Sequence, residues 1–148
     1  MKFEKFFKNV GTHGTIVKRN EVESWLVCGG VGMKIPVGVN NLGISQEPDR
    51  LFSAIVNSIT DDDILTLKRA VIYDAEGKAK DIIRVFETDL GDEVGIYNDD
   101  FGLIEKKDVL TYLEIEDDDK GIDYKIIVVK DHKGETIGYI FGTKDFIC

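Results

Sequence analysis

The sequence predicts a single domain over residues 1–148 of the α+β class, mostly β, built on an antiparallel meander that forms a sandwich, a barrel or a curved sheet. Three observations support this prediction. Short runs of alternating apolar and polar residues recur along most of the chain. Pairs of Asp or Asn with Gly separate most of these runs, which is typical of tight turns. The chain contains no internal repeat or linker, and 148 residues suit one domain with its own core.

The first expected element is a short N-terminal helix over residues 2–9. Four apolar side chains recur at spacings of three and four, on one helical face: Phe3, Phe6, Phe7 and Val10. Lysine and glutamate fill the opposite face, and Gly11 follows where a helix-ending glycine is common. A helix lying on a membrane surface has a similar pattern, but two turns are short for that role and the acidic chain opposes anionic lipid. We therefore expect this helix to cover the core.

The pattern changes to a period of two from Thr15 onward, and the stretches TIVKR and SWLVC are expected to be strands. Apolar side chains then occupy odd positions: Trp25, Val27, Val31, Met33, Ile35, Val37 and Val39. This alternation predicts one half-buried strand or two successive short strands. The intervening glycines indicate a bulge, a bend or a close backbone approach, and Pro36 indicates a strand edge or a break.

The stretch CGGVGMKIP, residues 28–36, contains the glycines and the lysine of a phosphate-binding loop. Such a loop needs a lysine, a hydroxyl side chain for magnesium and a following helix. Met33 stands where the loop lysine is required, and Ile35 and Pro36 replace the hydroxyl. Because Pro36 pushes Ile35 toward extended geometry, a helix is not expected there. A dinucleotide fingerprint fails as well, since its third glycine is missing. We therefore interpret this stretch as strand.

A second helix is expected near residues 48–58, where Pro48 suits the first helical position. Three apolar residues follow at a spacing of four: Leu51, Ile55 and Ile59. The next stretch, TDDDILTLKRAVIY, fits two interpretations. Thr60 and Asp63 match a capping box that starts a helix, whereas the later apolar residues alternate as in a strand. We expect a strand near 68–73 and leave residues 61–68 open between helix and strand.

The rest of the chain is expected to be a meander of short strands. The apolar runs cover residues 70–73, 81–87, 93–97, 101–105, 109–115, 124–129 and 136–141. The turns between them are DAEGK, DLGD, NDDFG, DDDKG and DHKG. Strands at this spacing are typical of a sandwich, a barrel or a curved antiparallel sheet.

The charge of the chain limits its partners. A formal net charge of −9 repels the phosphate backbone, and the lysines are scattered, so nucleic acid is not an expected partner. The apolar runs are too short to span a bilayer and the first residues do not resemble a secretory signal, so a membrane is not expected either. Two cysteines, Cys28 and Cys148, are too few for a disulfide framework and suit a cytoplasmic protein.

Residues that carry chemistry are few, and we assign no catalytic residue, cofactor or metal ion. The possible zinc ligands do not lie at the short spacings of a zinc site: His13, Cys28, His132 and Cys148. The acidic clusters lie in expected turns and do not match a calcium-binding loop. The serines lack the context of a nucleophile elbow. A non-enzymatic protein is therefore expected.

Five stretches together resemble small uncharacterised proteins encoded in phage and prophage virion-gene clusters of gut Firmicutes. They are VGTHGTIVK (10–18), WLVCGGVGMKIPVGVNNLGIS (25–45), GKAKDIIRVFE (77–87), VGIYNDDFGLIEKKD (94–108) and VVKDHKGETIGYIF (128–141). The resemblance covers most of the chain and assigns a chemical role to no residue. It implies a virion or assembly component, such as a capsid accessory, connector or tail-associated protein. The expected location is the cytoplasm, or the virion if the protein is encoded by a phage.

Two functions follow as hypotheses. The first is a non-enzymatic structural or interaction protein that acts as an oligomer, with itself or with other virion proteins. Strand edges would supply its interface together with an apolar stripe, for which the candidates are Trp25, Val31, Met33, Ile35 and Val37. The second is a small-molecule-binding protein or enzyme with a β-lined pocket, whose wall the tyrosines and Trp25 would form.

Overall fold

The computed structural model describes the chain except for residues 12, 19–22, 37–65, 76–78, 118–120 and 144–148. The described part is mostly β, with antiparallel sheets and two helices, α1 (Phe3–Val10) and α3 (Asn98–Phe101). This confirms the predicted fold class and the N-terminal helix. The helix expected near 48–58, the open segment 61–65 and the candidate residue Val37 lie outside the described residues.

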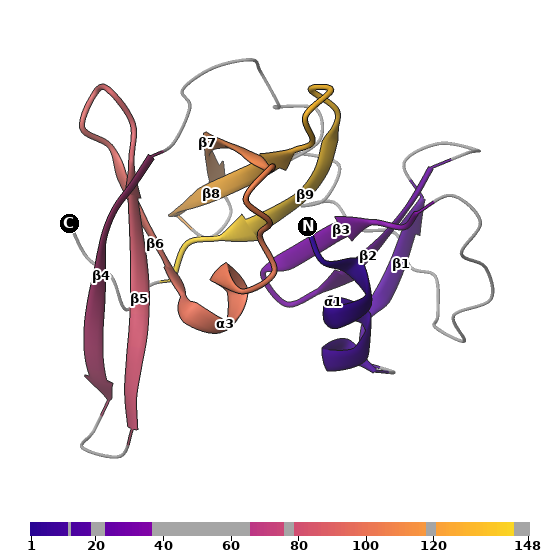
Figure 1. The fold of residues 1–148 in the computed structure, drawn as a ribbon, viewed down its shortest axis with the longest axis horizontal. Coiled ribbons are helices and arrows are strands. Elements are labelled where there is room, and N and C mark those ends of the chain that lie inside the picture. Colours follow the sequence, from indigo (N-terminus) through magenta and orange to yellow (C-terminus); the bar gives the residue numbers. More distant parts are fainter. Residues whose placement is uncertain (12, 19–22, 37–65, 76–78, 118–120, 144–148) are drawn as a thin grey trace.

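The larger sheet has six strands in the order β1-β2-β3-β9-β8-β7. Its strands are β1 (Thr15–Lys18), β2 (Ser24–Cys28), β3 (Val31–Lys34), β7 (Val109–Asp117), β8 (Ile122–Lys130) and β9 (Thr136–Phe141). Two three-strand meanders, β1-β2-β3 and β7-β8-β9, lie edge to edge because β3 pairs with β9 in antiparallel register. The sheet therefore joins an early part of the chain to a late one (Figure 1).

The smaller sheet is a meander of β4 (Thr66–Ala75), β5 (Ala79–Glu87) and β6 (Glu93–Tyr97). It stands at one end of the molecule beside β8 (Figure 1). Backbone and side-chain hydrogen bonds hold it there: Thr143 N–H donates to the Gly95 carbonyl at 2.7 Å, and Lys125 Nζ donates to the Glu93 carbonyl at 3.3 Å. Inserted in the chain between the halves of the larger sheet, it interrupts the continuous meander that the sequence predicts.

Most predicted strands are present, including SWLVC, EVGIY and TIGYIF, whose observed bounds match the predicted ones. Residues 66–68, left open from sequence, belong to β4. The strand expected at residues 101–105 is wrong. Asn98, Asp99 and Asp100 instead begin the one-turn helix α3, since such residues favour the first turn of a helix. The chain then bends through Gly102 and buries Leu103 in the core.

The stretch that resembled a phosphate-binding loop is a β-hairpin. Gly29 occupies the left-handed region with φ of 59°, in a two-residue turn between β2 and β3. Strand β3 follows the turn, and not the helix that a phosphate-binding loop requires. The turn also reverses the face on which odd positions lie, because Leu26 pairs with Met33 across it. Of the two predicted alternatives for this stretch, the described residues form two successive short strands, and the odd positions of β2 and β3 lie on opposite faces of the sheet.

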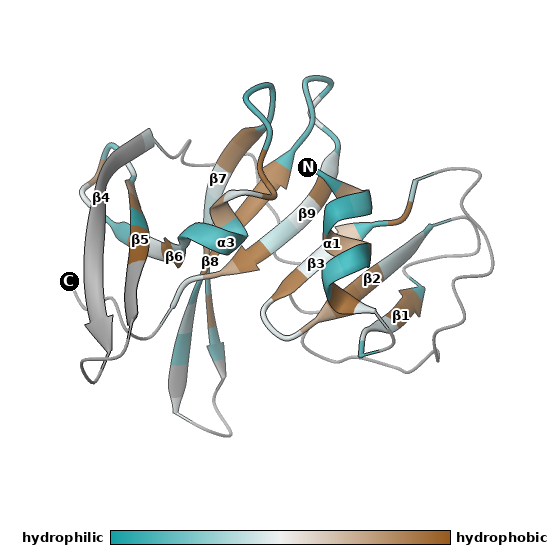
Figure 2. Ribbon diagram, turned by 60° about the horizontal axis from the view of Figure 1, so that its bottom comes forward, coloured by the Kyte–Doolittle hydropathy of each residue, from teal (hydrophilic) through white to brown (hydrophobic). Residues whose placement is uncertain are grey.

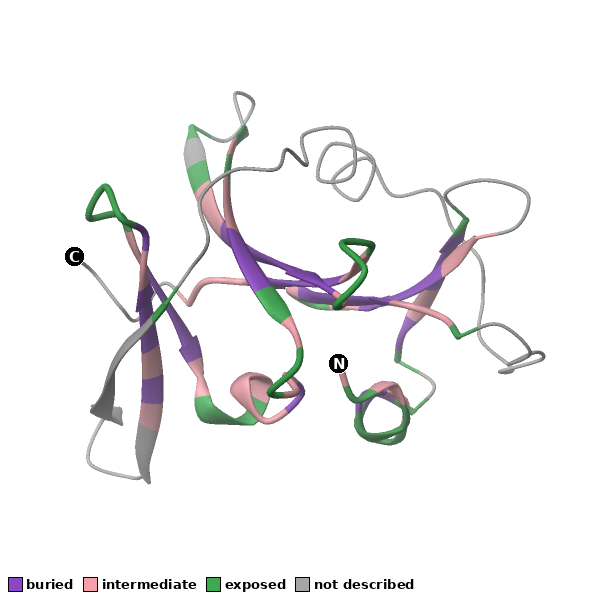
Figure 3. Ribbon diagram, turned by 45° about the horizontal axis from the view of Figure 1, so that its top comes forward, coloured by how far each residue is buried: buried purple, intermediate pink, exposed green. Residues whose placement is uncertain are grey.

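One face of the larger sheet carries the main core cluster. Its buried members from this sheet include Leu26, Val31, Met33, Ile127 and Ile140. Helix α1 contributes Phe6 and Val10 to this cluster, and the smaller sheet contributes Phe86, Val94 and Ile96. Figure 3 shows α1 and α3 on the same side of the curved sheet, and Figure 2 shows hydrophilic residues along much of the α1 ribbon. Phe6 and Val10 thus cover the core, as predicted.

The opposite face holds a second cluster of buried residues: Val17, Trp25, Val27, Ile126, Val128 and Tyr139. A row of aromatic side chains from β2, β9 and β8 lies there, with ring centroids 6.2 Å apart for Trp25 and Tyr139, 5.7 Å for Tyr139 and Phe141, and 5.3 Å for Phe141 and Tyr124. Trp25 Nε1 donates a 2.8 Å hydrogen bond to Glu23, which satisfies its polar atom. The aromatic side chains of this row therefore pack against each other.

Replacing Gly32 by Ala should destabilise the fold. Gly32 lies opposite Tyr139 in the β3–β9 register, and a Cβ at this position would overlap the Tyr139 ring. We expect a loss of about 1–3 kcal/mol in the free energy of unfolding, the range for overpacking a core. Urea denaturation measures this loss.

Gly102→Ala is the matched control. Gly102 has a φ of −64°, which any residue can adopt, and the atom closest to an added Cβ would be Nζ at the flexible end of the Lys5 side chain. This substitution should change stability little. Equal effects of the two substitutions would contradict the close approach of β3 and the Tyr139 ring.

Candidate functional site

The five residues predicted for an interface occupy different environments. Trp25 and Met33 are each 1% exposed and Val31 is 7% exposed, on opposite faces of the sheet. Ile35 is half-buried and Val37 lies outside the described residues. The structure therefore does not bring the described members together as one exposed stripe, and an interface at these positions stays a prediction.

Two of the five residues, Met33 and Ile35, meet at a surface pocket that we call the N-terminal pocket. Its volume is about 270 Å³, and its described wall consists of Met1, Phe3, Met33, Lys34, Ile35, Pro36 and Ile137. These residues come from the N-terminal segment, from β3 and the residues after it, and from β9. Lys34 is the one residue of this described wall with a charged side chain. The wall is therefore apolar except for one cationic group.

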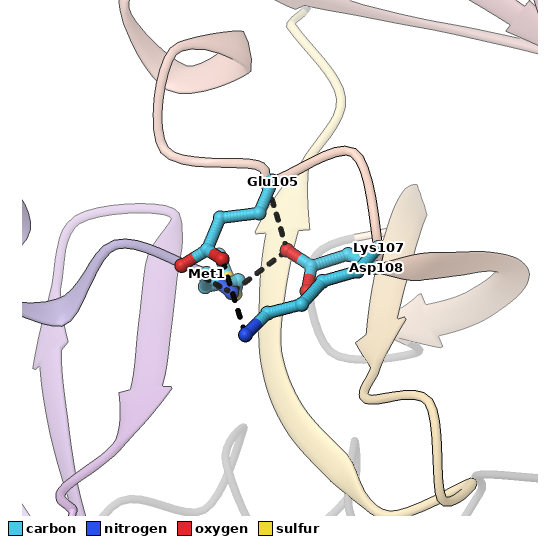
Figure 4. Close-up of polar contacts among 4 residues, drawn as sticks. All are labelled: Met1, Glu105, Lys107 and Asp108. Carbon is cyan, nitrogen blue, oxygen red and sulfur yellow. Dashed lines mark hydrogen bonds and ion pairs between the residues drawn. The ribbon is translucent and has the colours of Figure 1, made fainter.

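The N-terminal segment is fixed to the pocket by a buried ion pair (Figure 4). The Met1 ammonium lies 2.7 Å from Asp108 Oδ2, and the side chains of the two residues are 2% and 0% exposed. A second carboxylate oxygen, Glu105 Oε1, lies 3.8 Å from the same ammonium. The backbone adds a 2.8 Å hydrogen bond from Lys2 N–H to the Leu103 carbonyl. The Met1 side chain rests on Gly138, where a Cβ would collide with its sulfur.

Asp108 has one satisfied and one unsatisfied carboxylate oxygen. Oδ2 accepts a hydrogen bond from Glu105 N–H at 2.9 Å in addition to the ammonium. Oδ1 is buried without a hydrogen-bond partner among the described residues. A half-satisfied carboxylate in the interior depends strongly on its remaining partner, because an unpaired buried charge is costly.

A second hollow, of about 340 Å³, lies beside α3 and is acidic. It is lined by Ile82, Tyr97, Asn98, Asp99 and Asp100. Burial, reinforced by the charge of Asp99, raises the pKa of Asp100 above its ordinary value. Arg84 stabilises this region, since Arg84 Nε donates to Asn98 Oδ1 at 3.0 Å and the guanidinium stacks 4.9 Å from the centre of the Phe101 ring.

The predicted turn DHKG connects β8 to β9, and Asp131 organises it. Partial desolvation acts to raise the pKa of Asp131, but hydrogen bonds from the backbone N–H groups of Glu135 and Lys133 and the nearby positive charges outweigh it, so this pKa is lowered. Both N–H groups donate to Oδ1, at 3.0 and 2.8 Å. The carboxylate of this acidic turn therefore has a structural role.

The histidines and the cysteine that the structure describes lie apart from each other. Among the described residues, no three His, Cys, Asp or Glu side chains gather closely enough to hold a metal ion. His13 and His132 are exposed on separate loops, and Cys28 is half-buried as a free thiol. In the part of the chain that the structure describes, no helix has the length and hydropathy needed to cross a bilayer.

Sequence reasoning missed the N-terminal pocket because its wall joins three distant segments. Met1, Asp108 and Ile137 carry no local pattern that marks them as neighbours. Gly138 is the one residue of the sequence that indicates this contact, since a glycine inside a predicted strand is typical of a position that another group approaches closely. The N-terminal helix was predicted, but not the anchoring of the residue before it.

Comparisons with known proteins do not supply a function. No protein-family model, curated protein or solved structure matches the chain. Any functional conclusion therefore has to come from the geometry of the described residues.

Removing the Asp108 charge should be strongly destabilising. Asp108→Asn leaves the Met1 ammonium buried beside a neutral side chain, and we expect a loss of about 3–5 kcal/mol, the range for breaking a buried ion pair. Chemical denaturation of both proteins at neutral pH measures the difference.

Lys107→Gln provides the control within the same group of residues. Lys107 is 67% exposed and lies 3.5 Å from Glu105, so its loss should cost less than about 1 kcal/mol. An Asp108→Asn protein as stable as Lys107→Gln would show that the buried pair is not stabilising.

The raised pKa of Asp100 predicts a pH-dependent gain on substitution. A carboxyl whose folded pKa is raised favours folding when protonated, and this contribution is lost as pH rises through the folded value. Asp100→Asn should therefore raise the melting temperature slightly at neutral pH and leave it unchanged well below pH 3.8, the ordinary value. Exposed Asp123→Asn is the control. A lower melting temperature for Asp100→Asn at neutral pH would contradict the assignment.

Proposed function

We propose that this chain is a non-enzymatic structural or interaction protein that acts through protein partners, the first of them a second copy of itself. The observation that carries the proposal is the outer strand β7 of the six-stranded sheet. It runs for nine residues, from Val109 to Asp117. Within the described residues β7 pairs with β8 alone, so its other edge faces away from the sheet.

The outer strand β4 of the smaller sheet is longer, at ten residues, but its side chains after Thr66 lie outside the described residues, so a register can be derived for β7 and not for β4. Strand β1 at the opposite edge of the larger sheet is four residues long. The outer strand β6 of the smaller sheet is partly covered, because Gly95 accepts a hydrogen bond from Thr143 at 2.7 Å. Long edges with backbone groups directed outward are the ones that other chains pair with.

The ladder of β7, β8 and β9 shows which backbone groups of β7 point outward. Gly142 N–H donates to the Lys125 carbonyl, so the Lys125 backbone faces β9 and that of the next residue, Ile126, faces β7. Ile126 pairs with Leu113, whose backbone therefore faces β8. By alternation, the backbone of Glu114 faces away from the sheet, where an added strand would bind.

The side chains of β7 permit antiparallel pairing with its own copy. A two-fold axis at Leu113 would place Glu114 opposite Tyr112 and Glu116 opposite Leu110 of the copy, so that exposed carboxylates do not face each other directly. On the other side of the strands, Leu113 would join the two copies of Ile115 in one apolar strip. An axis at Ile115 would instead place Glu114 opposite Glu116 of the copy, so the repulsion of like charges disfavours that register.

The acidic chain makes this association dependent on salt. Two copies of net charge −9 repel each other at long range, and ions screen this repulsion. The resemblance of the sequence to phage and prophage virion-gene products supports a particle component or an assembly factor as the biological setting. In that setting edge pairing would connect this chain to copies or to other virion proteins.

A substitution at the β7 edge tests the proposal. Light scattering over a range of concentrations should show a dimer that strengthens with added salt. Glu114→Pro removes an outward N–H without removing a bond to β8, so it should leave the fold intact and abolish the dimer.

Glu114→Thr is the matched control, because it keeps the N–H, removes one charge and favours strand geometry. It should dimerise at least as tightly as the parent chain. A parent chain that stays monomeric at every concentration and salt level, or a Glu114→Pro dimer of unchanged affinity, would refute pairing through β7.

A further inference from the structure

We propose that the N-terminal pocket is a binding site for a medium-chain aliphatic carboxylate, with the hydrocarbon tail in the apolar wall and the carboxylate on Lys34. This inference is independent of pairing through β7, because the described lining of the pocket comes from the N-terminal segment, β3 and β9. The described side chains of the pocket wall include no Ser, Thr, Cys, His, Asp or Glu, and we therefore assign the pocket a bound ligand and not a reaction.

The wall of the pocket favours an aliphatic tail. Phe3, Ile35 and Ile137 are each only partly buried, although all three pack against the main core. Met1 and Met33 add two unbranched, apolar thioether side chains to this wall. Burial of a methylene group in such a wall contributes about 0.8 kcal/mol.

The size of the pocket limits the ligand. At about 270 Å³ it lies just below the usual range for small-molecule sites, roughly 300–1,000 Å³. A nucleotide or a polycyclic lipid would exceed it, whereas a single extended chain fits. The Lys34 side chain in the wall is 29% exposed, so a polar head beside it can remain hydrated while the tail is buried.

Lys34 determines the charge of the ligand. Its Nζ lies 3.8 Å from Glu135 Oε2, beyond hydrogen-bond distance, and the two side chains are 29% and 67% exposed. Because an exposed pair of this kind contributes little, a ligand carboxylate can replace Glu135 at low cost. One lysine beside one glutamate favours a monoanion, since a dianionic phosphate would meet more repulsion from Glu135 and from the acidic chain.

The rigidity of the wall also favours binding. The Met1 ammonium is held by Asp108 at 2.7 Å, and Met33 lies in the β3–β9 pairing opposite Gly138. The two thioether side chains are therefore positioned before a ligand arrives, which lowers the entropic cost of binding.

The two methionines of the sequence both line the pocket, which gives the test a direct readout. A chain labelled with ¹³C at the methionine methyl groups should show two signals in an NMR spectrum. Titration with octanoate should shift both signals to saturation. Octan-1-ol should bind more weakly, and octylammonium more weakly still, because Lys34 repels it.

Substitutions separate the contribution of the head group from that of the tail. Lys34→Gln should weaken octanoate binding about three- to fivefold, as expected for an exposed ion pair, and leave octan-1-ol binding unchanged. The control Lys8→Gln alters an exposed lysine of α1 outside the described pocket wall and should change neither affinity. Ile137→Phe fills the pocket and should weaken binding of both ligands, and a thermal melt checks that each variant is folded.

Two results would overturn the proposal. The first is the absence of a saturable shift of either methyl signal with octanoate. The second is equal affinity for octanoate and octylammonium, which would exclude recognition of charge by Lys34. Because light scattering reports on β7 and the methyl signals report on the pocket, failure of one proposal is distinguishable from failure of the other.

Discussion

The pairing of β3 with β9 is the constraint on which the rest of the structure depends. It aligns Val31 with Ile140, Gly32 with Tyr139 and Met33 with Gly138, and so joins two meanders into one sheet. Two glycines make the approach possible, because a Cβ on Gly32 would overlap the Tyr139 ring and one on Gly138 would collide with the Met1 sulfur. Each glycine thus leaves room on its own face of the sheet for one large side chain.

The same pairing positions both core clusters and the pocket. On one face it places Met33 and Ile140 beneath α1, and on the other it places Tyr139 against Trp25. The N-terminal segment then closes over the main core, held by Asp108. The β7 edge lies on the far side of β8 and remains directed outward. The apolar pocket and the outer edge are therefore separate consequences of one sheet order.

Local patterns in the sequence predicted local structure well and failed where distant residues meet. The hairpin turns and strands followed from alternation and from Asp–Gly pairs, as in EVGIY and TIGYIF. The apolar side chains at odd positions do not form one stripe across β2 and β3, because a two-residue turn reverses the face without disturbing the alternation. The strand expected at 101–105 was wrong because helix-starting residues outweighed its apolar side chains. The contact of Met1 with Asp108 could not be predicted, since a buried ion pair between distant positions leaves no periodic pattern.

The insertion of the smaller sheet between β3 and β7 has a consequence for how the chain acquires its shape. The hairpins can close early because their strands are near in sequence, whereas β3 and β9 must find each other across most of the chain. During synthesis β1, β2 and β3 emerge first, and β3 presents a bare edge until β9 leaves the ribosome. That interval is when the nascent chain is most open to pairing with the wrong strand, and the brevity of β3, four residues, limits the risk.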